Sequence, residues 1–218
     1  MKQFAVIGIG KFGYYLATHL YSRGHEVLAI DIDQNLVQKI KNSVSSAVVA
    51  DTTDPEVLKS LGLKDIDTVV VCIGSILSNS ILTSLNLLEL GVKNIMAKSL
   101  SEAHGRILRR IGIKNVFFPE KDLAISLAEK LHTPNLIDYF PFMEGYSIIQ
   151  IAVPPQFVGK SLKDMNINYK FGVQIIAVKE FIPERVIMIP KGDFIMKDSD
   201  MLTLLGPNDS LEKFKKHS

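Results

Sequence analysis

Short apolar runs alternate with helix-compatible segments through the first 130 or so residues of the chain. Strands that are apolar throughout are typical of a parallel sheet that helices cover on both faces. The alternation therefore predicts an α/β fold with a doubly wound, six-stranded parallel (Rossmann-like) sheet. The strands are expected at Phe4–Ile7, Glu26–Ile30, Ala47–Ala50, Thr68–Ile73, Ile95–Ala97 and Val116–Phe118, with helices beginning near Phe12, Gln34, Pro55, Ile76, Ser101 and Glu120.

Two of these helix starts carry capping signals. Asp33 and Asp54 suit the N-cap position, and Pro55 suits the first helical position, where its missing N–H costs nothing. The segment from Ile76 to Leu90 differs, because apolar residues fall on nearly all of its sides. Either it is buried between the sheet and a neighbouring helix, or it forms a contact between subunits.

The rhythm changes after about Leu131. A helix is expected to end at 132–135, and the mostly apolar and aromatic stretch Leu136–Met143 follows it. We therefore expect a first domain over residues 1–134, an apolar connector over 135–145 and a smaller α+β C-terminal lobe over 146–218. In this lobe the pattern predicts strands at Ser147–Val153, Gln174–Lys179, Val186–Ile189 and Met201–Leu205, and a helix from about Ser210.

The first strand runs directly into a glycine-rich turn, Gly8-Ile9-Gly10-Lys11-Phe12-Gly13. In a strand–turn–helix–strand setting this G-x-G-x-x-G pattern indicates a nucleotide site, the alternative being a ligand-free glycine turn. Gly8 would permit the tight turn and Gly10 the approach of a phosphate. Gly13 would let the helix pack closely, with its N-terminal N–H groups facing the anion. Asp31, at the end of the second strand, would bind a ribose diol and disfavours the 2′-phosphate of NADP.

Further candidates follow the other strands, whose carboxyl ends meet at one edge of such a sheet. Asp51 and Thr52 would hold an adenine amine, cap the next helix, or do both. Lys11 stands where a phosphate chain would end, and it is either a partner of the terminal phosphate or a solvated lysine. Glu120 opens a helix, where an acid is an ordinary partner of the helix dipole. The same edge of the sheet also carries Asp33, Ile73, Gly74 and Lys98.

Composition narrows the class of protein. The chain has 218 residues, of which 47% are hydrophobic and 22% charged, and this is typical of a globular protein. No apolar run is long enough to span a membrane, and the first strand leaves no room for a signal peptide. The net charge of +2 is spread along the chain, so no nucleic-acid partner is expected. The single cysteine, Cys72, lies in an apolar run and is expected to be an inert core residue of a cytosolic protein.

The groups that catalysis would need are missing from the C-terminal lobe. A dehydrogenase uses a general acid or base beside the nicotinamide, usually supplied by a second domain. Here no histidine occurs in the lobe before His217, and the chain shows no Ser-His-Asp pattern, Walker loop or metal-spaced Cys/His set. We therefore expect a nucleotide sensor without turnover. The alternative is an NAD-dependent oxidoreductase that uses the same first domain.

The motifs together resemble those of one family. The regulator-of-potassium-conductance (RCK) domains of Trk/Ktr potassium uptake systems are similar in the stretches Gly8–Gly13, Asp31–Asp33, Asp51–Asp54, Val70–Gly74 and Phe118–Asp122. Their C-terminal lobe is similar to Tyr146–Ile149, Gly159–Leu162 and Gly172–Ala177. The resemblance covers essentially the whole chain.

The resemblance implies a cytoplasmic regulatory subunit at the inner face of the membrane. It would form homodimers, commonly an octameric ring, beneath a potassium-translocating subunit of the TrkH/KtrB type. Adenine nucleotides (ATP, ADP, AMP or NAD/NADH) would gate transport, and Glu120 would lie near a divalent cation, Mg or Ca, at a subunit contact. The implied nucleotide-binding residues are Gly8, Gly10, Lys11, Phe12, Gly13, Asp31, Asp33, Asp51, Thr52, Ile73, Gly74 and Lys98.

Two positions depart from the family pattern. Close Ktr relatives carry arginine where Lys11 stands, and a lysine cannot form the bidentate contact that arginine makes with a γ-phosphate. Relatives that bind cyclic di-AMP in the C-terminal lobe carry arginine where this chain has Asn168, so that ligand is not expected here.

Overall fold

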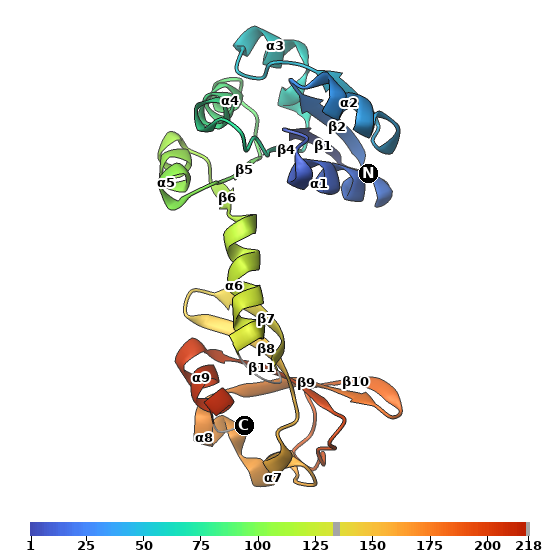
Figure 1. The fold of residues 1–218 in the computed structure, drawn as a ribbon, viewed down its shortest axis with the longest axis vertical. Helices are drawn as coiled ribbons and strands as arrows, with labels where there is room; N and C mark the ends of the chain where they lie inside the picture. Colours follow the sequence, from blue (N-terminus) through green and yellow to red (C-terminus); the bar gives the residue numbers. More distant parts are fainter. Residues whose placement is uncertain (133–135, 217–218) are drawn as a thin grey trace. The chain divides into compact units, whose positions relative to one another are not determined.

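The structure, a computed structural model, describes residues 1–132 and 136–216. The chain forms two compact units, Met1–Pro119 and Glu120–Ser218 (Figure 1). Among the described residues, no helix combines the length and apolar character needed to cross a membrane.

The first unit has the predicted doubly wound fold. Its six strands lie in the order β3-β2-β1-β4-β5-β6, and every neighbouring pair is parallel. The elements are β1 (Gln3–Ile7), α1 (Lys11–Ser22), β2 (Glu26–Asp31), α2 (Gln34–Ile40), β3 (Ser46–Val49), α3 (Pro55–Ser60), β4 (Thr68–Val71), α4 (Leu77–Glu89), β5 (Ile95–Lys98), α5 (Glu102–Ile111) and β6 (Asn115–Phe117).

Alternate residues of each strand serve two separate cores. Ala5 and Ile7 of β1 belong to one buried cluster, which also contains residues of α3, α4 and α5. Val6, between them, belongs to another cluster with residues of α1 and α2. Because neighbouring side chains of a strand point to opposite faces, α1 and α2 cover one face of the sheet and the other three helices cover the opposite face (Figure 1).

The predicted caps are confirmed. The Asp33 side chain accepts a hydrogen bond from Asn35 N at 2.8 Å, at the start of α2. Asp54 accepts one from Glu56 N at 2.9 Å at the start of α3, and Pro55 is the first residue of that helix. These caps fix where the chain leaves the ends of β2 and β3, which is the edge of the sheet that carries the candidate site.

Helix α4 buries several polar side chains in addition to its apolar residue Leu87. Its buried residues include Ser80, Thr83, Ser84 and Asn86, whereas Leu77 and Leu82 are exposed. Of the two alternatives for this segment, burial against the sheet is therefore confirmed for its apolar residue Leu87, and Ile81 and Leu88 pack against the same core. Small hydroxyl side chains can be buried in a helix because they can hydrogen-bond to nearby backbone groups. Ser84 Oγ does so by donating to Ser80 O at 2.7 Å.

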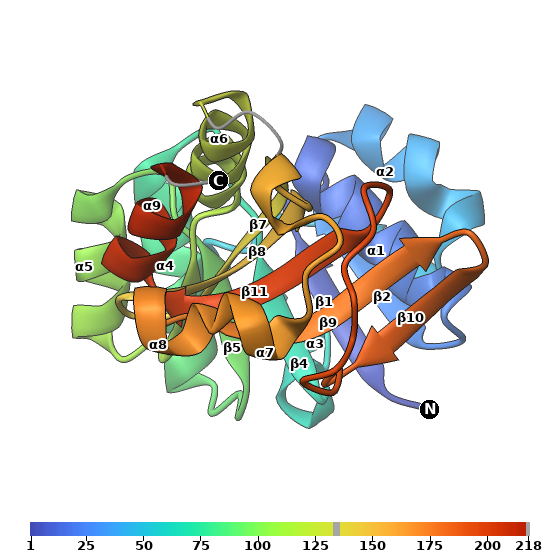
Figure 2. The ribbon, with the colours of Figure 1, turned by 90° about the horizontal axis from the view of Figure 1, so that it is seen from below.

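The second unit is an antiparallel sheet in the order β10-β9-β11-β8-β7. Helices α7, α8 and α9 share one buried apolar core with this sheet (Figure 2). The elements are α6 (Pro119–His132), β7 (Leu136–Met143), β8 (Tyr146–Ala152), α7 (Leu162–Met165), α8 (Ile167–Phe171), β9 (Gln174–Phe181), β10 (Glu184–Met188), β11 (Met201–Pro207) and α9 (Asn208–Lys216).

The expected connector over 135–145 is largely a strand. Residues 136–143 form β7, which pairs antiparallel with β8 from Leu136 opposite Ile151 to Met143 opposite Tyr146. Gly145, at a φ of 78°, supplies the left-handed residue that a tight hairpin turn needs. The apolar and aromatic stretch was therefore the signal of a strand at the edge of a sheet. The expected helix end falls partly on residues 133–135, which lie outside the described residues.

Helix α6, expected within the first domain, makes its contacts in the second unit. Ser126 Oγ donates to Tyr139 O at 3.1 Å, and Lys130 Nζ lies 2.6 Å from Asp138 Oδ1. Lys215 of α9 adds an ion pair with Glu129 at 3.1 Å. These polar contacts explain why the division between the units lies at 119/120 rather than at 134.

A buried carboxylate holds the β9–β10 hairpin to the segment before β11. Glu180 has a side chain that is 1% exposed, and it accepts hydrogen bonds from Arg185 and, at 2.6 Å, from Lys197 Nζ. The hydrogen bonds from Arg185 and Lys197 lower the pKa of Glu180 below its ordinary value. The charged form is therefore the one that the fold stabilises.

Glu180→Gln is expected to lower the melting temperature at pH 7, because the amide removes the charge that two cations face. The folded-state pKa of Glu180 lies below its unfolded value of about 4.5, so this contribution is present above that value. It is lost as the pH falls through the lower, folded-state pKa. Thermal melts at pH 7 and pH 3 should thus show a difference between wild type and variant that shrinks in acid.

Glu184→Gln, in the same hairpin, is the matched control. Its ion pair with Lys179 spans 3.3 Å, but the Glu184 side chain is 73% exposed. Exposed pairs contribute little, so we expect almost no change in melting temperature. Equal shifts for the two variants would contradict the special position of Glu180.

Candidate functional site

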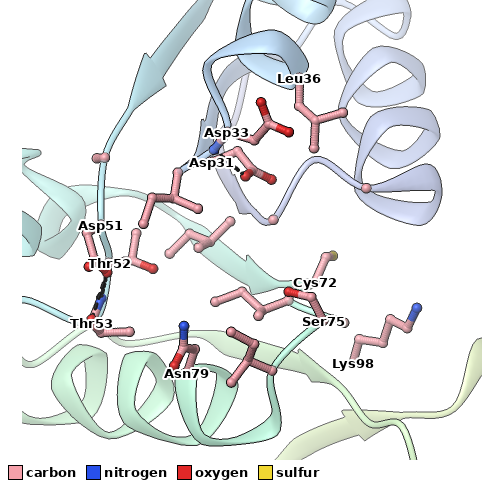
Figure 3. A pocket seen from close by; sticks show the side chains of 18 of the residues that line it. Asp31, Asp33, Leu36, Asp51, Thr52, Thr53, Cys72, Ser75, Asn79 and Lys98 are labelled. Carbon is pink, nitrogen blue, oxygen red and sulfur yellow. Dashed lines mark hydrogen bonds between the residues drawn. The ribbon is translucent and has the colours of Figure 1, made fainter.

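A cavity of about 540 Å³ opens at the carboxyl edge of the parallel sheet in the first unit (Figure 3). This volume is typical of small-molecule and cofactor sites. The turns after β1, β2, β3 and β4 form its walls, as the fold class predicts. Of the residues predicted to bind a nucleotide, ten line the cavity: Gly8, Gly10, Phe12, Asp31, Asp33, Asp51, Thr52, Ile73, Gly74 and Lys98. Lys11 and Gly13 are not among the lining residues.

Each of the three glycines of the turn is required for a different geometric reason. Gly8 has a φ of +92°, and a Cβ there would lie 2.8 Å from Ile73 N. A Cβ on Gly13 would lie 1.9 Å from Gly8 O, so only glycine lets α1 pack against the turn. No atom lies within 4 Å of a Cβ built on Gly10, which borders the cavity. Gly8 and Gly13 therefore build the turn, and Gly10 keeps space in front of it.

The start of α1 and two lysines make one end of the site electropositive. Gly10 is the N-cap residue, no side chain of the described residues caps this helix, and its first turn contains no acid. A helix N-terminus of this kind attracts anions through its N–H groups and its dipole. Lys98, only 7% exposed, lines the cavity with Nζ 5.7 Å from the centroid of the Phe12 ring. Lys11 is the exposed first residue of α1.

Asp31 joins the end of β2 to the glycine turn. Its Oδ2 accepts a hydrogen bond from Ile9 N at 2.5 Å, and its Oδ1 accepts one from Asp33 N at 2.9 Å. Each carboxylate oxygen has a further lone pair for a ligand. The side chain lines the cavity next to that of Asp33 (Figure 3). Asp31 is therefore both a structural partner of the turn and an acceptor for a hydroxyl group.

Asp51 is oriented by its own loop. Its Oδ1 accepts hydrogen bonds from Thr53 N at 2.9 Å and from Thr53 Oγ1 at 2.7 Å. These two hydrogen bonds, the one from the hydroxyl first, lower the pKa of Asp51, so the carboxylate is charged at neutral pH. The N-cap of α3 is Asp54, so the expectation that Asp51 caps this helix is wrong. Its carboxylate is thus an acceptor on the cavity wall.

Two side chains of α4 hold this loop in place. Thr52 Oγ1 lies 3.0 Å from Thr83 Oγ1, and both residues are buried. One turn further along α4, Asn86 Nδ2 donates to Thr53 O at 2.9 Å. The polar side of α4 described above is therefore the support of the cavity wall, and the position of the loop is set by the helix.

Sequence reasoning missed part of the lining. The walls also include Ile7, Ile32, Leu36, Ala50, Thr53, Cys72, Ser75, Ile76 and Asn79. Most of these residues are next in sequence to predicted positions at strand ends, so they could have been predicted from the sequence as cavity-lining residues. Cys72 is buried, as expected, and it also lines the cavity. Asn79 had no such signal, because the apolar pattern of α4 hid its polar side.

Glu120, the predicted metal neighbour, is the exposed second residue of α6 and belongs to the second unit. Asp122 lies in the same first turn. Over residues 1–132 and 136–216, no three His, Cys, Asp or Glu side chains gather in a way that could hold a metal ion. The described part of one chain therefore does not fit a complete metal site at Glu120.

Comparison with known proteins identifies both units. The TrkA-N domain family matches residues 4–119, and the TrkA-C domain family matches residues 147–217. The Ktr system potassium uptake protein C of Bacillus subtilis is 37% identical, covering 99% of this chain and 96% of its own. The Ktr system potassium uptake protein A of the same organism is 34% identical, with 98% and 96% coverage.

A solved structure shares the fold. The GsuK channel bound to NAD superposes with a TM-score of 0.67 at 20% identity. The match covers 96% of this chain and 38% of the channel chain. At this identity the likeness concerns the arrangement of the chain alone.

Proposed function

Because the chain belongs to the TrkA family, with a TrkA-N domain followed by a TrkA-C domain, we propose that it is a nucleotide-sensing regulatory subunit of a potassium uptake system. The main support for this proposal is the cavity in the first unit. It combines an uncapped helix N-terminus and Lys98 at one end with the carboxylates of Asp31 and Asp51 toward the other. That polarity suits a molecule with phosphates, a ribose and a base.

In this proposal the phosphates lie over Gly10 and the first turn of α1, near Lys98. The ribose hydroxyls donate to Asp31, whose charge disfavours a 2′-phosphate. The adenine base lies toward Asp51, which accepts from its exocyclic amine. The ligand is an adenine nucleotide (ATP, ADP, AMP or NAD/NADH), bound without turnover. The NAD in the GsuK channel is a reason to include NAD in binding experiments.

The partner is a membrane potassium-translocating subunit of the TrkH/KtrB type, and the chain would act on its cytoplasmic side. The names of the two Ktr relatives support a potassium uptake system. We propose a homo-oligomer, a dimer or an octameric ring of dimers. Exposed apolar side chains support contacts between subunits: Leu123 is 70% exposed and Leu131 80% exposed on α6. A Mg or Ca ion at Glu120 would need ligands from a second subunit.

Reconstituted potassium flux tests the proposal. Flux through the partner should differ between ATP and ADP only when this chain is present, because a ligand shifts an equilibrium only by its differential affinity for two states. Shifting an equilibrium from 1:99 to 99:1 takes roughly 5.5 kcal/mol, or about 0.7 kcal/mol for each of about eight sites. One exposed lysine–phosphate contact is of that order. Lys11→Ala should therefore narrow the ATP/ADP flux ratio without abolishing nucleotide binding.

Lys41→Ala is the control, since Lys41 is exposed and is not among the cavity-lining residues. It should leave the flux ratio unchanged. An unchanged ratio in Lys11→Ala would make Lys11 a solvated side chain. Potassium flux that is the same with and without this chain would contradict the proposed function.

A further inference from the structure

The side chain of Asn79, a polar residue of α4, borders the cavity and makes only a weak contact with the described residues. Thr83 and Asn86 hold the loop after β3 through Thr52 and Thr53. Asn79 precedes Thr83 by four residues, so it lies on the same side of the helix, about 6 Å nearer its N-terminus. It is half-buried and lines the cavity. The three residues form one polar row, of which the first faces the ligand space instead of the loop.

The amide of Asn79 is available to a ligand. Its Oδ1 lies 3.5 Å from Ser78 Oγ, a weak contact. Within the described part of the chain, its Nδ2 donates no hydrogen bond, and Figure 3 shows this nitrogen directed into the cavity. On the adjacent wall, Asp51 uses Oδ1 for Thr53, whereas its Oδ2 accepts no hydrogen bond from the described residues. A donor and an acceptor thus border the same space.

We infer that Asn79, together with Asp51, selects a 6-amino purine over a 6-oxo purine at this site. The inference rests on the proposed function, since it concerns the base of the proposed nucleotide. Adenine offers a donor, its exocyclic amine, beside an acceptor, ring N1. Asp51 can only accept, which matches the amine, and Asn79 Nδ2 can donate to N1. Hypoxanthine reverses both groups, so its O6 would face the Asp51 carboxylate.

ADP and IDP differ in these two groups alone, so their affinity ratio is the measurement. Isothermal titration of the full chain should show that wild type binds ADP roughly 10- to 100-fold more tightly than IDP. Asn79→Asp places an acceptor against the N1 acceptor of adenine, so the ADP/IDP ratio should fall roughly tenfold or more. Asn79→Ala, which removes the donor without adding charge, should lower the ratio roughly 2- to 10-fold.

The double variant Asp51→Asn with Asn79→Asp reverses the hydrogen-bonding polarity of the wall and should prefer IDP. Asn35→Asp is the matched control, because Asn35 is an exposed residue of α2 that does not line the cavity. It introduces the same charge through the same isosteric change, and should keep the wild-type ratio. Melting curves verify that each variant is folded.

The outcomes separate the two claims. A wild type that binds ADP, with an ADP/IDP ratio that neither Asn79→Asp nor Asn79→Ala alters, overturns the assignment of Asn79 and leaves the nucleotide site standing. A wild type that binds ADP and IDP equally overturns it as well. A wild type that binds none of ADP, ATP and NAD overturns the proposed function and this inference together.

Discussion

Gly13→Ala is expected to disrupt the first unit, lowering its melting temperature by roughly 6–12 °C or more. An added Cβ would lie 1.9 Å from Gly8 O, a backbone atom that cannot rotate away. Either α1 moves off the turn or the turn itself opens, and overpacking of this kind costs about 3 kcal/mol or more. For a chain of this size each kcal/mol shifts the melting temperature by about 2–4 °C. Thermal melts followed by circular dichroism measure the effect.

Gly10→Ala is expected to weaken ligand binding while leaving the stability of the fold almost unchanged. A Cβ there meets no atom within 4 Å, and the φ of −64° suits alanine. The unit should therefore melt within about 4 °C of wild type, the remaining cost being the poorer N-cap. Because the methyl group would project where a phosphate approaches, ADP should nonetheless stabilise this variant far less than wild type. Equal melting temperatures for the two variants would contradict the different positions assigned to Gly10 and Gly13.

The contrast between these glycines shows how much of the site the sequence predicted. The G-x-G-x-x-G motif predicted the turn, and the order of strand ends predicted that Asp31, Asp51 and Lys98 would meet, because carboxyl ends of parallel strands share one edge. Both predictions depend on local pattern and on topology. The structure adds that Gly8 and Gly13 contact each other across the turn.

What the sequence could not predict depends on packing. The polar row of α4 was hidden, since an apolar count does not reveal which side of a helix is buried. The hydrogen bonds of Thr83 with Thr52 and of Asn86 with Thr53 help to set that side. The strand β7 was mistaken for a connector because Leu136–Met143 lacks strict alternation and pairs only with β8, at the edge of the sheet. In both cases the deciding partner is distant in the sequence or on another element.

Asp31→Ala is expected to abolish the stabilisation of the chain by an adenine nucleotide. A ligand that binds only the folded state stabilises it by about 2.7 kcal/mol at a hundredfold excess over Kd. For wild type this corresponds to a rise in melting temperature of roughly 5–10 °C. Without Asp31 the ribose loses its acceptor, and the turn loses the hydrogen bonds to Ile9 N and Asp33 N. Melting curves with millimolar ATP, ADP, AMP and NAD measure the shift.

Asp54→Ala distinguishes the ligand contact from the structural loss. Asp54 also accepts a backbone hydrogen bond, from Glu56 N, but it does not line the cavity. Loss of this N-cap should cost about 1 kcal/mol of unfolding free energy, so the ligand-free variant should melt slightly earlier while keeping the full nucleotide shift. Asp31→Ala should melt earlier and show no shift. A full nucleotide shift in Asp31→Ala would contradict the proposal that the ribose binds Asp31. No shift in wild type with any of the four nucleotides would contradict the proposal that a nucleotide binds in the cavity.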